Sequence, residues 1–365
     1  MKIVDLKAYQ GELQYNGPAY AFAEGRCYQT FISTVVVLTT NDGLEGYGEV
    51  CPCGPRYMPA FAEGIPACLA QLRPCVLGED PCQTTRIFQR MEQALNGHAV
   101  AKAAIDMACW DLLGKASGLP VHVLLGGLLS ESMPLHRILP LTAADDVNAS
   151  LSILRQQKIH HFQLKLGRDV EEDIALVNEL EGACSPGEVW VGDINGAWRP
   201  DEALRFSRQM ADLPLYLEEP CGDYQQNLAV RSRLHHPVKL DESLNSLADV
   251  LRALRDNAMD AMALKLSRYG GLTVARQVRD VCVAHGVPLT IEDAWGSGIA
   301  TAAYAHLAAS TPSRYLLNTT DLHNYNTTQL ADGAPIVEQG RMTVSAEAGL
   351  GVKPDLTKLH ATKLA

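Results

Sequence analysis

Short apolar segments alternate with helix-length amphipathic segments from about Pro134 onward. Eight of the apolar segments have the length and composition of strands: PLHRILPL, HFQLKLG, EVWVGDING, LPLYLEEP, PVKLDES, AMALKLSRYGG, VPLTIEDAWG and RYLLNTTD. Eight successive strand-then-helix units over about 200 residues are typical of a parallel barrel. A doubly wound open sheet is the competing architecture, but it does not usually need so many units. The pattern therefore predicts a (β/α)-barrel over residues 131–332.

The first 130 residues follow a different pattern. MKIVDLKAYQ alternates apolar and polar positions, and FISTVVVLTT is β-branched and followed by the turn signal NDGLEGYGEV. These features predict antiparallel strands and a hairpin. A helical region is expected from about Phe61 to Leu125, with Gly118 ending one helix. Strands followed by helices indicate a small α+β domain.

The expected fold is therefore α/β, a modified (β/α)-barrel of the TIM type (β/α7β-like) with an N-terminal α+β capping domain. The capping domain is expected to comprise residues 1–130 and about 333–365. Within this last segment, RMTVSA and GLGVKPD are predicted to return to the first domain.

Composition and charge restrict the partners of the chain. The net charge of −11 argues against nucleic acid, because phosphate binding needs a clustered positive field. No apolar stretch approaches the roughly 20 residues that cross a bilayer. The ten cysteines form no paired CxxC, which favours free thiols in a reducing cytoplasm. We expect a cytoplasmic protein that acts on a small molecule and not on a membrane, and a homo-oligomer whose subunit number the sequence does not fix.

Five charged residues carry the candidate chemistry, because each ends an apolar strand segment and they follow one another at one strand–helix repeat: Lys165, Asp193, Glu218, Asp241 and Lys265. The C-terminal strand ends of a barrel converge on one mouth, so these residues should be neighbours. Three carboxylates together need a cation to stay ionised, and an all-oxygen set suits Mg²⁺ first and Mn²⁺ second. Each acid alone would more readily be a helix N-cap. Three acids in register favour the metal site.

The two lysines flank the three acids in the strand order. A lysine base must be neutral part of the time, and burial, a nearby cation and a second ammonium would each depress its pKa from about 10.4. Lysines on opposite walls would reach both faces of one carbon. A substrate carboxylate bound to Mg²⁺ would accept the charge as an enediolate. A solvated lysine at a strand end is the competing interpretation, but each of these lysines lies between two leucines.

Several segments resemble the enolase superfamily, in the mandelate racemase and muconate lactonizing enzyme group, over nearly the whole chain: AKAAIDMACWDLLGKASGLPVHVLLGG, QLKLG, GDINGAW, LEEP, LDES, LKLSRYGGLT and GLGV. The resemblance implies that Asp193, Glu218 and Asp241 bind the metal, with Glu218 as the first residue of the E-[EQ]-P motif. It also implies that Lys165 and Lys265 are the acid/base pair. Asn195 resembles the residue that supports the first ligand.

The nearest resemblance is to an amino-acid-acting branch that includes hydroxyproline betaine 2-epimerases. The shared motifs are GPxY at Gly54–Tyr57, QxKxG at Gln163–Gly167 and DAWG at Asp293–Gly296. Many relatives carry a Lys-x-Lys pair where this chain has Gln163, so less positive charge is expected beside Lys165. The betaine enzymes hold a quaternary ammonium with a tryptophan near the eighth strand end. This chain has Thr319, Thr320 and Asp321 there.

The substrate prediction rests on the seventh and eighth strand ends. Asp293 and Asp321 should face the mouth, where a carboxylate would bond an ammonium that carries N–H donors. This favours proline, a hydroxyproline or another amino acid. Tyr57 and Trp295 are candidates for an apolar wall, and Arg56 lies in a loop that would form a lid and meet a carboxylate. The competing interpretations are helix caps for the two acids, plain packing for Trp295 and a solvent-facing Arg56.

The leading functional hypothesis is Mg²⁺-dependent racemisation or 2-epimerisation of an amino-acid or proline-type substrate. The same site would serve a dehydratase of a hydroxyproline or hydroxy acid, a cycloisomerase or a dipeptide epimerase, and the sequence does not separate these reactions. A non-catalytic binding protein on an inherited barrel is a hypothesis of another class. It predicts the loss of at least one of the five site residues, and all five are present.

Overall fold

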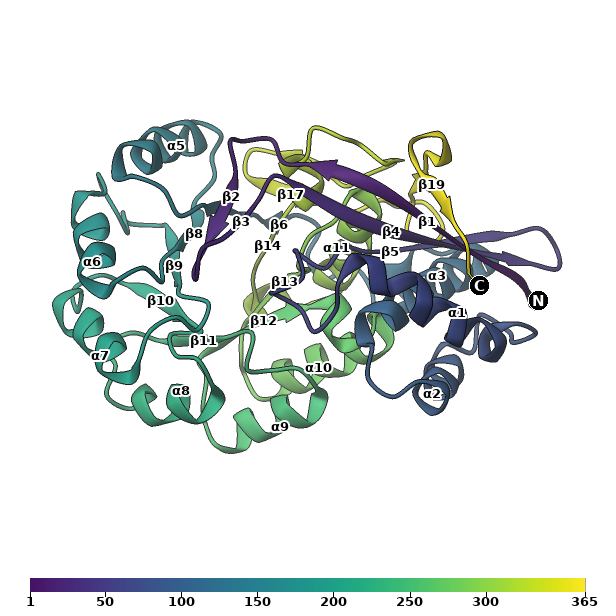
Figure 1. The fold of residues 1–365 in the computed structure, drawn as a ribbon, viewed down its shortest axis with the longest axis horizontal. Coiled ribbons are helices and arrows are strands. Elements are labelled where there is room, and N and C mark those ends of the chain that lie inside the picture. The colour runs from purple at the N-terminus through teal and green to yellow at the C-terminus, as the bar shows by residue number, and fades with distance from the viewer. Residues whose placement is uncertain (365) are drawn as a thin grey trace.

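The computed structural model describes residues 1–364 and shows an antiparallel sheet with helices beside a barrel of parallel strands (Figure 1). The antiparallel sheet has the order β19-β1-β4-β5. Its strands are β1 Ile3–Gln14, β4 Thr30–Thr40, β5 Glu45–Val50 and β19 His360–Thr362. The central strand β4 is β-branched and almost continuously buried, so it forms the middle of this sheet. The expected hairpin is confirmed as the antiparallel pair of β4 and β5.

The helical region is divided into separate helices. They are the 3₁₀ helix η1 Ala62–Gly64 and the α-helices α1 Ile65–Val76, α2 Thr84–Ala94, α3 Ala99–Ser117 and α4 Val121–Leu124. Helix α3 is buried on nearly all sides and ends at Gly118, whose φ of 69° lies in the left-handed region that glycine adopts without strain. A small hairpin of β2 Tyr20–Phe22 and β3 Arg26–Tyr28 extends from the antiparallel sheet toward the barrel (Figure 1).

All eight predicted barrel strands are present and hydrogen-bond in chain order. They are β7 His136–Leu139, β8 His161–Lys165, β9 Val189–Asp193, β10 Leu215–Glu218, β11 Val238–Leu240, β12 Ala261–Lys265, β13 Leu289–Glu292 and β14 Leu316–Thr319. An isolated bridge between Leu135 and Thr319 joins the two ends, which makes the barrel nearly closed. The predicted (β/α)-barrel with a capping unit is thereby confirmed.

Helices follow the barrel strands and cover the outside of the barrel (Figure 1). They are α5 Ala144–Gln156, α6 Val170–Glu179, α7 Pro200–Gln209, α8 Tyr224–Arg231, α9 Leu247–Arg255, α10 Leu272–Ala284 and α11 Gly298–Ala309. Four 3₁₀ helices lie at loops: η2 Leu266–Tyr269, η3 Ser313–Tyr315, η4 Leu322–Tyr325 and η5 Leu356–Lys358. Within residues 1–364, none of the helices combines the length and the apolar character that a bilayer-spanning segment requires.

The C-terminal segment returns to the capping domain only in part. Its strands are β15 Ala331–Asp332, β16 Ile336–Glu338, β17 Arg341–Thr343 and β18 Lys353–Pro354. Strand β17, the predicted RMTVSA strand, pairs with β6 Met133–Pro134, which directly precedes the first barrel strand, and not with the antiparallel sheet. The GLGV segment does contact the capping domain, since Leu350 donates its backbone N–H to Asp111 on α3, and β19 pairs with β1. The boundaries at residues 130 and 332 stay predictions.

Candidate active site

The five predicted site residues lie at the C-terminal end of the barrel strands. Parallel register places Lys165 opposite Asp193, and Asp193 opposite Glu218. Asp241 follows two residues after the partner of Glu218, on the next strand. Lys165 on β8 and Lys265 on β12 are four strands apart in a ring of eight. The two lysines therefore stand on opposite walls, with the three acid-bearing strands between them.

Asp193 is held by two donors from β8. Lys165 Nζ bonds its Oδ2, and Gln163 Nε2 donates to the same oxygen at 3.0 Å. Lys165 Nζ also donates to Asn195 Oδ1 at 3.2 Å, and the backbone N–H of Asn195 donates to Asp193 Oδ1 at 3.0 Å. Asn195 thus contacts the first acid and the first lysine together.

Glu218 is fully buried and receives two hydrogen bonds on a single oxygen. Gln163 Nε2 donates to Oε2 at 2.8 Å, and Lys239 Nζ donates to the same oxygen at 3.0 Å. Among the described residues, the other oxygen, Oε1, has no hydrogen-bond partner. Burial raises the pKa of Glu218 to about 7, although Lys239 lowers it. A buried carboxylate oxygen without a partner is costly, so it indicates a ligand at this position.

Asp241 is the most heavily paired of the three acids. Lys265 Nζ donates to its Oδ2 at 2.6 Å, and Tyr57 Oη donates to the same oxygen at 2.8 Å. Arg268 binds the other carboxylate oxygen and also donates to the backbone carbonyl at 2.7 Å. Burial raises the pKa of Asp241, but Arg268 and Lys265 lower it by more, so this carboxyl is held ionised.

The two lysines are both buried and both paired with acids. Burial lowers the pKa of Lys165, but the Asp193 carboxylate and Tyr20 raise it by more. Burial likewise lowers the pKa of Lys265, and Asp241 and Glu292 raise it well above its usual value. The depressed lysine pKa expected from the sequence is therefore not the direction found here, because each ammonium lies against a carboxylate.

The acid set fits a hard divalent cation. Three carboxylates end neighbouring strands and one of them has an unpartnered buried oxygen, which is the donor chemistry that Mg²⁺ prefers. Within residues 1–364, however, no three His, Cys, Asp or Glu side chains already surround a common point. Two of the three carboxylates are paired with basic groups, Asp193 with Lys165 and Asp241 with Lys265 and Arg268.

The capping domain contributes an aromatic lining over the two lysines. Lys165 Nζ lies 5.5 Å from the ring centroid of Phe22, and Lys265 Nζ lies 5.5 Å from that of Tyr57. The two rings meet edge to face at 5.8 Å. Arg26 fixes the β2–β3 hairpin on the barrel by donating to the carbonyl of Asn195 at 3.4 Å. Tyr57 and Phe22 therefore lie together over the two lysines, and the contact of Tyr57 with substrate stays a prediction.

Asp293 and Asp321 are both occupied by protein donors. Asp293 Oδ2 accepts the backbone N–H of Ser267 at 3.0 Å, and burial raises the pKa of Asp293 to about 6. Asp321 forms a two-point ion pair with Arg137, whose Nη2 lies 2.8 Å from Oδ2. A substrate ammonium would have to compete with these bonds. The predicted substrate contacts of both acids stay predictions.

Trp295 is packed in the core, whereas Arg56 lies at the surface. Trp295 is 1% exposed, stacks on Phe31 with 4.0 Å between ring centroids, and donates Nε1–H to Asn326 at 2.9 Å. Arg56 is 55% exposed, and its guanidinium lies 3.7 Å from the carboxylate of Glu24. Neither side chain bonds one of the three acids or the two lysines, so their contact with substrate also stays a prediction.

Sequence reasoning missed three buried charges that contact the site. These are Lys239, Arg268 and Glu292, whose Oε1 lies 3.0 Å from Lys265 Nζ. Alternation along the strand was the available signal for Lys239, because it stands two residues before Asp241 and so shares its face. Arg268 lies in η2, outside any strand, and no comparable signal marks it.

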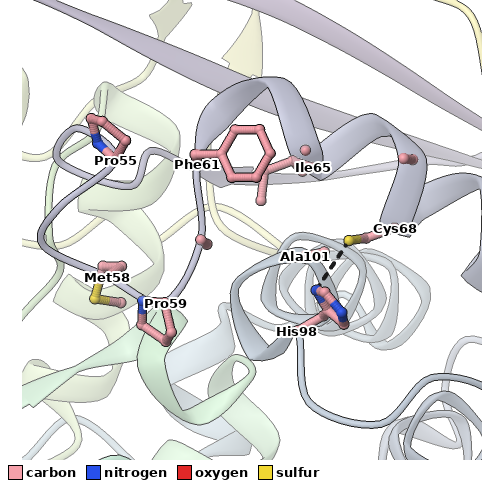
Figure 2. A pocket seen from close by; sticks show the side chains of 11 residues that line it. Pro55, Met58, Pro59, Phe61, Ile65, Cys68, His98 and Ala101 are labelled. Atoms are coloured by element: carbon pink, nitrogen blue, oxygen red, sulfur yellow. Dashed lines mark hydrogen bonds between the residues drawn. The ribbon is translucent and has the colours of Figure 1, made fainter.

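An apolar cavity of about 520 Å³ lies beside the loop that carries Tyr57 (Figure 2). It is lined by Pro55, Met58 and Phe61 from the loop and by α1 and α3, and it does not include any of the five site residues. Cys68 Sγ and His98 Nδ1 meet at 3.3 Å on its wall, as Figure 2 shows. His98 therefore belongs to this cavity and not to the barrel mouth.

Two family models match the chain. Residues 21–126 match the mandelate racemase / muconate lactonizing enzyme N-terminal domain, and residues 146–358 match the enolase C-terminal domain-like family. The chain is 40% identical over 354 residues to a cis-3-hydroxy-L-proline dehydratase of Roseibium aggregatum, covering 97% of this chain and 96% of that protein.

Solved structures agree with this match. A mandelate racemase/muconate lactonizing enzyme from Roseovarius nubinhibens is 40% identical with a TM-score of 0.93, covering 98% of this chain and 96% of that one. A second protein from that organism, complexed with magnesium, is 32% identical with a TM-score of 0.94, covering 100% of this chain and 99% of that one.

Proposed function

Because this chain belongs to the enolase superfamily, in the mandelate racemase/muconate lactonizing enzyme group, we propose that it removes the α-proton of a proline-type amino acid and expels a C3 hydroxyl as water. The chain is an enzyme of the isomerase or lyase type. The observation that carries the finer proposal is the pair of buried lysines, Lys165 and Lys265, on opposite walls of the barrel mouth. The printed activity of the R. aggregatum relative supplies the substrate class.

The acids Asp193, Glu218 and Asp241 would hold Mg²⁺, with Mn²⁺ as an alternative. When bound, the cation would draw carboxylate charge away from the two lysines and stabilise the negative charge that develops on the substrate carboxylate. Asn195 and Gln163 orient Asp193, and Tyr57 and Arg268 orient Asp241. The buried side chains keep water out of the mouth, which strengthens each of these interactions.

Stereochemistry connects the two lysines to dehydration. In cis-3-hydroxy-L-proline the hydroxyl and the carboxylate are on the same face of the ring, so the α-hydrogen and the hydroxyl are on opposite faces. One lysine takes the α-proton as the C–H bond breaks. The lysine on the other wall gives a proton to the departing hydroxyl as the C–O bond breaks, and water leaves. The enamine product then tautomerises to a cyclic imine.

Epimerisation at C2 is the second candidate, and it is the reaction that the sequence favoured. It uses the same two lysines, because one removes the α-proton and the other returns a proton from the opposite face. A substrate without a C3 hydroxyl has no group to expel, so epimerisation at C2 is the reaction expected for it. The arrangement of Lys165 and Lys265 on opposite walls supports both reactions, so the substrate decides between them.

The test is proton NMR in D₂O with the Mg²⁺-loaded enzyme and a panel of substrates. The panel contains cis-3-hydroxy-L-proline, trans-3-hydroxy-L-proline, trans-4-hydroxy-L-proline and L-proline. We expect the cis-3 compound to lose its C3 carbinol signal as the imine forms, and EDTA to stop the reaction. Exchange at C2 without loss of the hydroxyl would favour epimerisation. If none of the compounds exchanges its α-hydrogen, the proposed substrate class is wrong.

Single lysine variants separate the two roles. We expect one of the two variants, Lys165→Ala or Lys265→Ala, to lose both α-exchange and elimination. The lysine removed in that variant is the base. The other variant should retain α-exchange of cis-3-hydroxy-L-proline and lose elimination, which identifies the acid. Circular dichroism checks that both variants fold. If both variants still dehydrate the substrate at the wild-type rate, the two-lysine mechanism is wrong.

A further inference from the structure

The two oxygens of the Glu218 carboxylate have different surroundings. Oε2 receives hydrogen bonds from Gln163 on one side and Lys239 on the other, at 2.8 and 3.0 Å. Oε1 is buried and has no hydrogen-bond partner among residues 1–364. Rotation of the carboxylate would give up both bonds to Oε2. Glu218 therefore presents a single oxygen to whatever lies on its open side.

Lys239 is fixed in this position by burial. It belongs to β11, is 1% exposed, and stands opposite Glu218 in the parallel register. A buried ammonium that leaves its carboxylate partner stays desolvated and unpaired, which is strongly unfavourable. The ion pair with Glu218 is thus maintained while other groups of the site exchange partners. Gln163 adds a neutral donor to the same oxygen and links Glu218 to Asp193.

We propose that Lys239, together with Gln163, makes Glu218 a one-oxygen ligand and thereby selects Mg²⁺ against Ca²⁺. The inference rests on the proposed function, in which the three acids hold a divalent cation. Mg²⁺ is small and demands a near-octahedral set of oxygens at short distance. Ca²⁺ accepts six to eight oxygens and readily takes both oxygens of one carboxylate. Blocking Oε2 removes one of the oxygens that Ca²⁺ would otherwise gain.

The experiment compares the affinities of both cations by isothermal titration calorimetry on EDTA-treated, dialysed protein. In Lys239→Met, Oε2 loses its ammonium partner and becomes available. We expect the ratio of the Ca²⁺ to the Mg²⁺ dissociation constant to fall by about tenfold, the equivalent of one hydrogen bond to a charged group. Lys102→Met is the matched control, because Lys102 is equally buried but pairs with Glu92 in the capping domain. It should keep the wild-type ratio.

Two further variants keep the test decisive. Gln163→Leu removes the other donor to Oε2 and should shift the ratio in the same direction by less, which serves if Lys239→Met does not fold. The double variant Gln163→Lys/Lys239→Met returns an ammonium to Oε2 from β8, since Gln163 Nε2 already lies 2.8 Å from that oxygen. It should restore selectivity for Mg²⁺.

The outcomes separate this inference from the proposed function. If wild-type protein binds neither cation, the metal site itself is wrong. If wild type binds Mg²⁺ and the ratio is unchanged in both Lys239→Met and Gln163→Leu, the site stands and the role of Lys239 is overturned. If Lys102→Met shifts the ratio as much as Lys239→Met, the effect is a general one of buried charge and the inference also fails.

Discussion

Alternation along a strand decides which of two neighbouring acids reaches the barrel interior. At the end of β13, Glu292 contacts Lys265, whereas the next residue, Asp293, bonds Ser267 at the start of η2. The sequence favours Asp293, because it ends the strand. Glu292 shares the inward face with Thr290, and a strict period of two would have selected it.

The position of the two lysines and three acids at one end of the barrel could be predicted because each ends a separate strand at a regular spacing. What the sequence does not contain is which partner each charge takes. Arg137 and Asp321 are 184 residues apart and still form an ion pair. Such a pairing depends on barrel closure, since β7 and β14 are the first and last strands of the sheet. No local pattern indicates it.

Tyr57→Phe tests the hydrogen bond between the capping domain and Asp241. The variant loses the 2.8 Å bond from the phenol to Oδ2 but keeps the ring against Phe22. A hydrogen bond to a charged group is worth about 1.5–3 kcal/mol, so we expect kcat/KM for the proposed reaction to fall by about tenfold or more, with the melting temperature nearly unchanged. Tyr28→Phe, which alters a second ring beside Phe22, is the control. Equal rates in wild type and Tyr57→Phe would contradict this role.

Helix α11 follows β13 in the barrel, and an acid of the capping domain adds to the cap at its N-terminus. The Glu49 carboxylate on β5 accepts the backbone N–H groups of Ser297 and Ala300, each at 2.8 Å, and the Ser297 hydroxyl at 2.7 Å. A carboxylate at a helix N-terminus satisfies free N–H groups and complements the helix dipole. Glu49 lies 248 residues before Ser297, so no sequence pattern near α11 reveals the contact.

Glu49→Gln tests this cap. The amide nitrogen of glutamine would face N–H donors in place of one carboxylate oxygen, so we expect a loss of roughly 1–3 kcal/mol in the free energy of unfolding. Urea denaturation measures it. Glu12→Gln, at an exposed position of β1, is the control and should change stability by less than about 0.5 kcal/mol. A Glu49→Gln protein as stable as wild type would show that the cap does not contribute.

The contact between α4 and α11 should make stability depend on pH. His306 Nδ1 accepts the backbone N–H of His122 at 3.1 Å, and Nε2 donates to the carbonyl of Leu350 at 3.2 Å. Burial lowers the pKa of His306 from 6.5 to about 3, although Leu350 raises it. The folded chain therefore holds this imidazole neutral, and the stabilisation is present above pH 6.5 and is lost as the pH falls toward 3.

The expected change in the free energy of unfolding follows from the difference in the pKa of His306 between the folded and unfolded states. At pH 5 the unfolded state gains a proton that the folded state refuses, which lowers the free energy of unfolding by about 2 kcal/mol relative to pH 7. His306→Gln removes the titration, so urea denaturation at pH 5, 6 and 7 should show a smaller slope than in wild type. His360→Gln, at an exposed position of β19, is the control. The same slope in wild type and His306→Gln would contradict the assignment.

At the scale of the whole molecule, the sequence predicts two units with a boundary, and the structure shows that the larger of its two buried apolar clusters extends across both units. The principal cluster of buried apolar residues includes members of β1 and α3 as well as β12 and α10. Buried polar contacts reinforce it: Asp106 on α3 accepts the backbone N–H of Thr273 at 2.9 Å, and Trp110 donates to the Thr273 hydroxyl at 2.9 Å. A change in the hydrophobic pattern along the chain indicates where one kind of secondary structure gives way to another. It does not show how extensively the two units pack against each other.

This continuity leads to a prediction about unfolding. Two domains joined by an exposed linker would melt separately, whereas a shared core should melt as one cooperative unit, with calorimetric and van't Hoff enthalpies in agreement.

Asp106→Ala removes a buried acceptor from the Thr273 N–H at the N-terminus of α10. The variant should lower the temperature of the entire transition by a few degrees without splitting it. Differential scanning calorimetry on wild type and variant measures both. Asp169→Ala removes only the cap of α6, on the outside of the barrel, and is the comparison because the Asp169 side chain bonds only the backbone N–H of Glu171. Two resolved transitions in wild type, or a second transition that appears only in Asp106→Ala, would show that the capping domain and the barrel are coupled more weakly than their shared core implies.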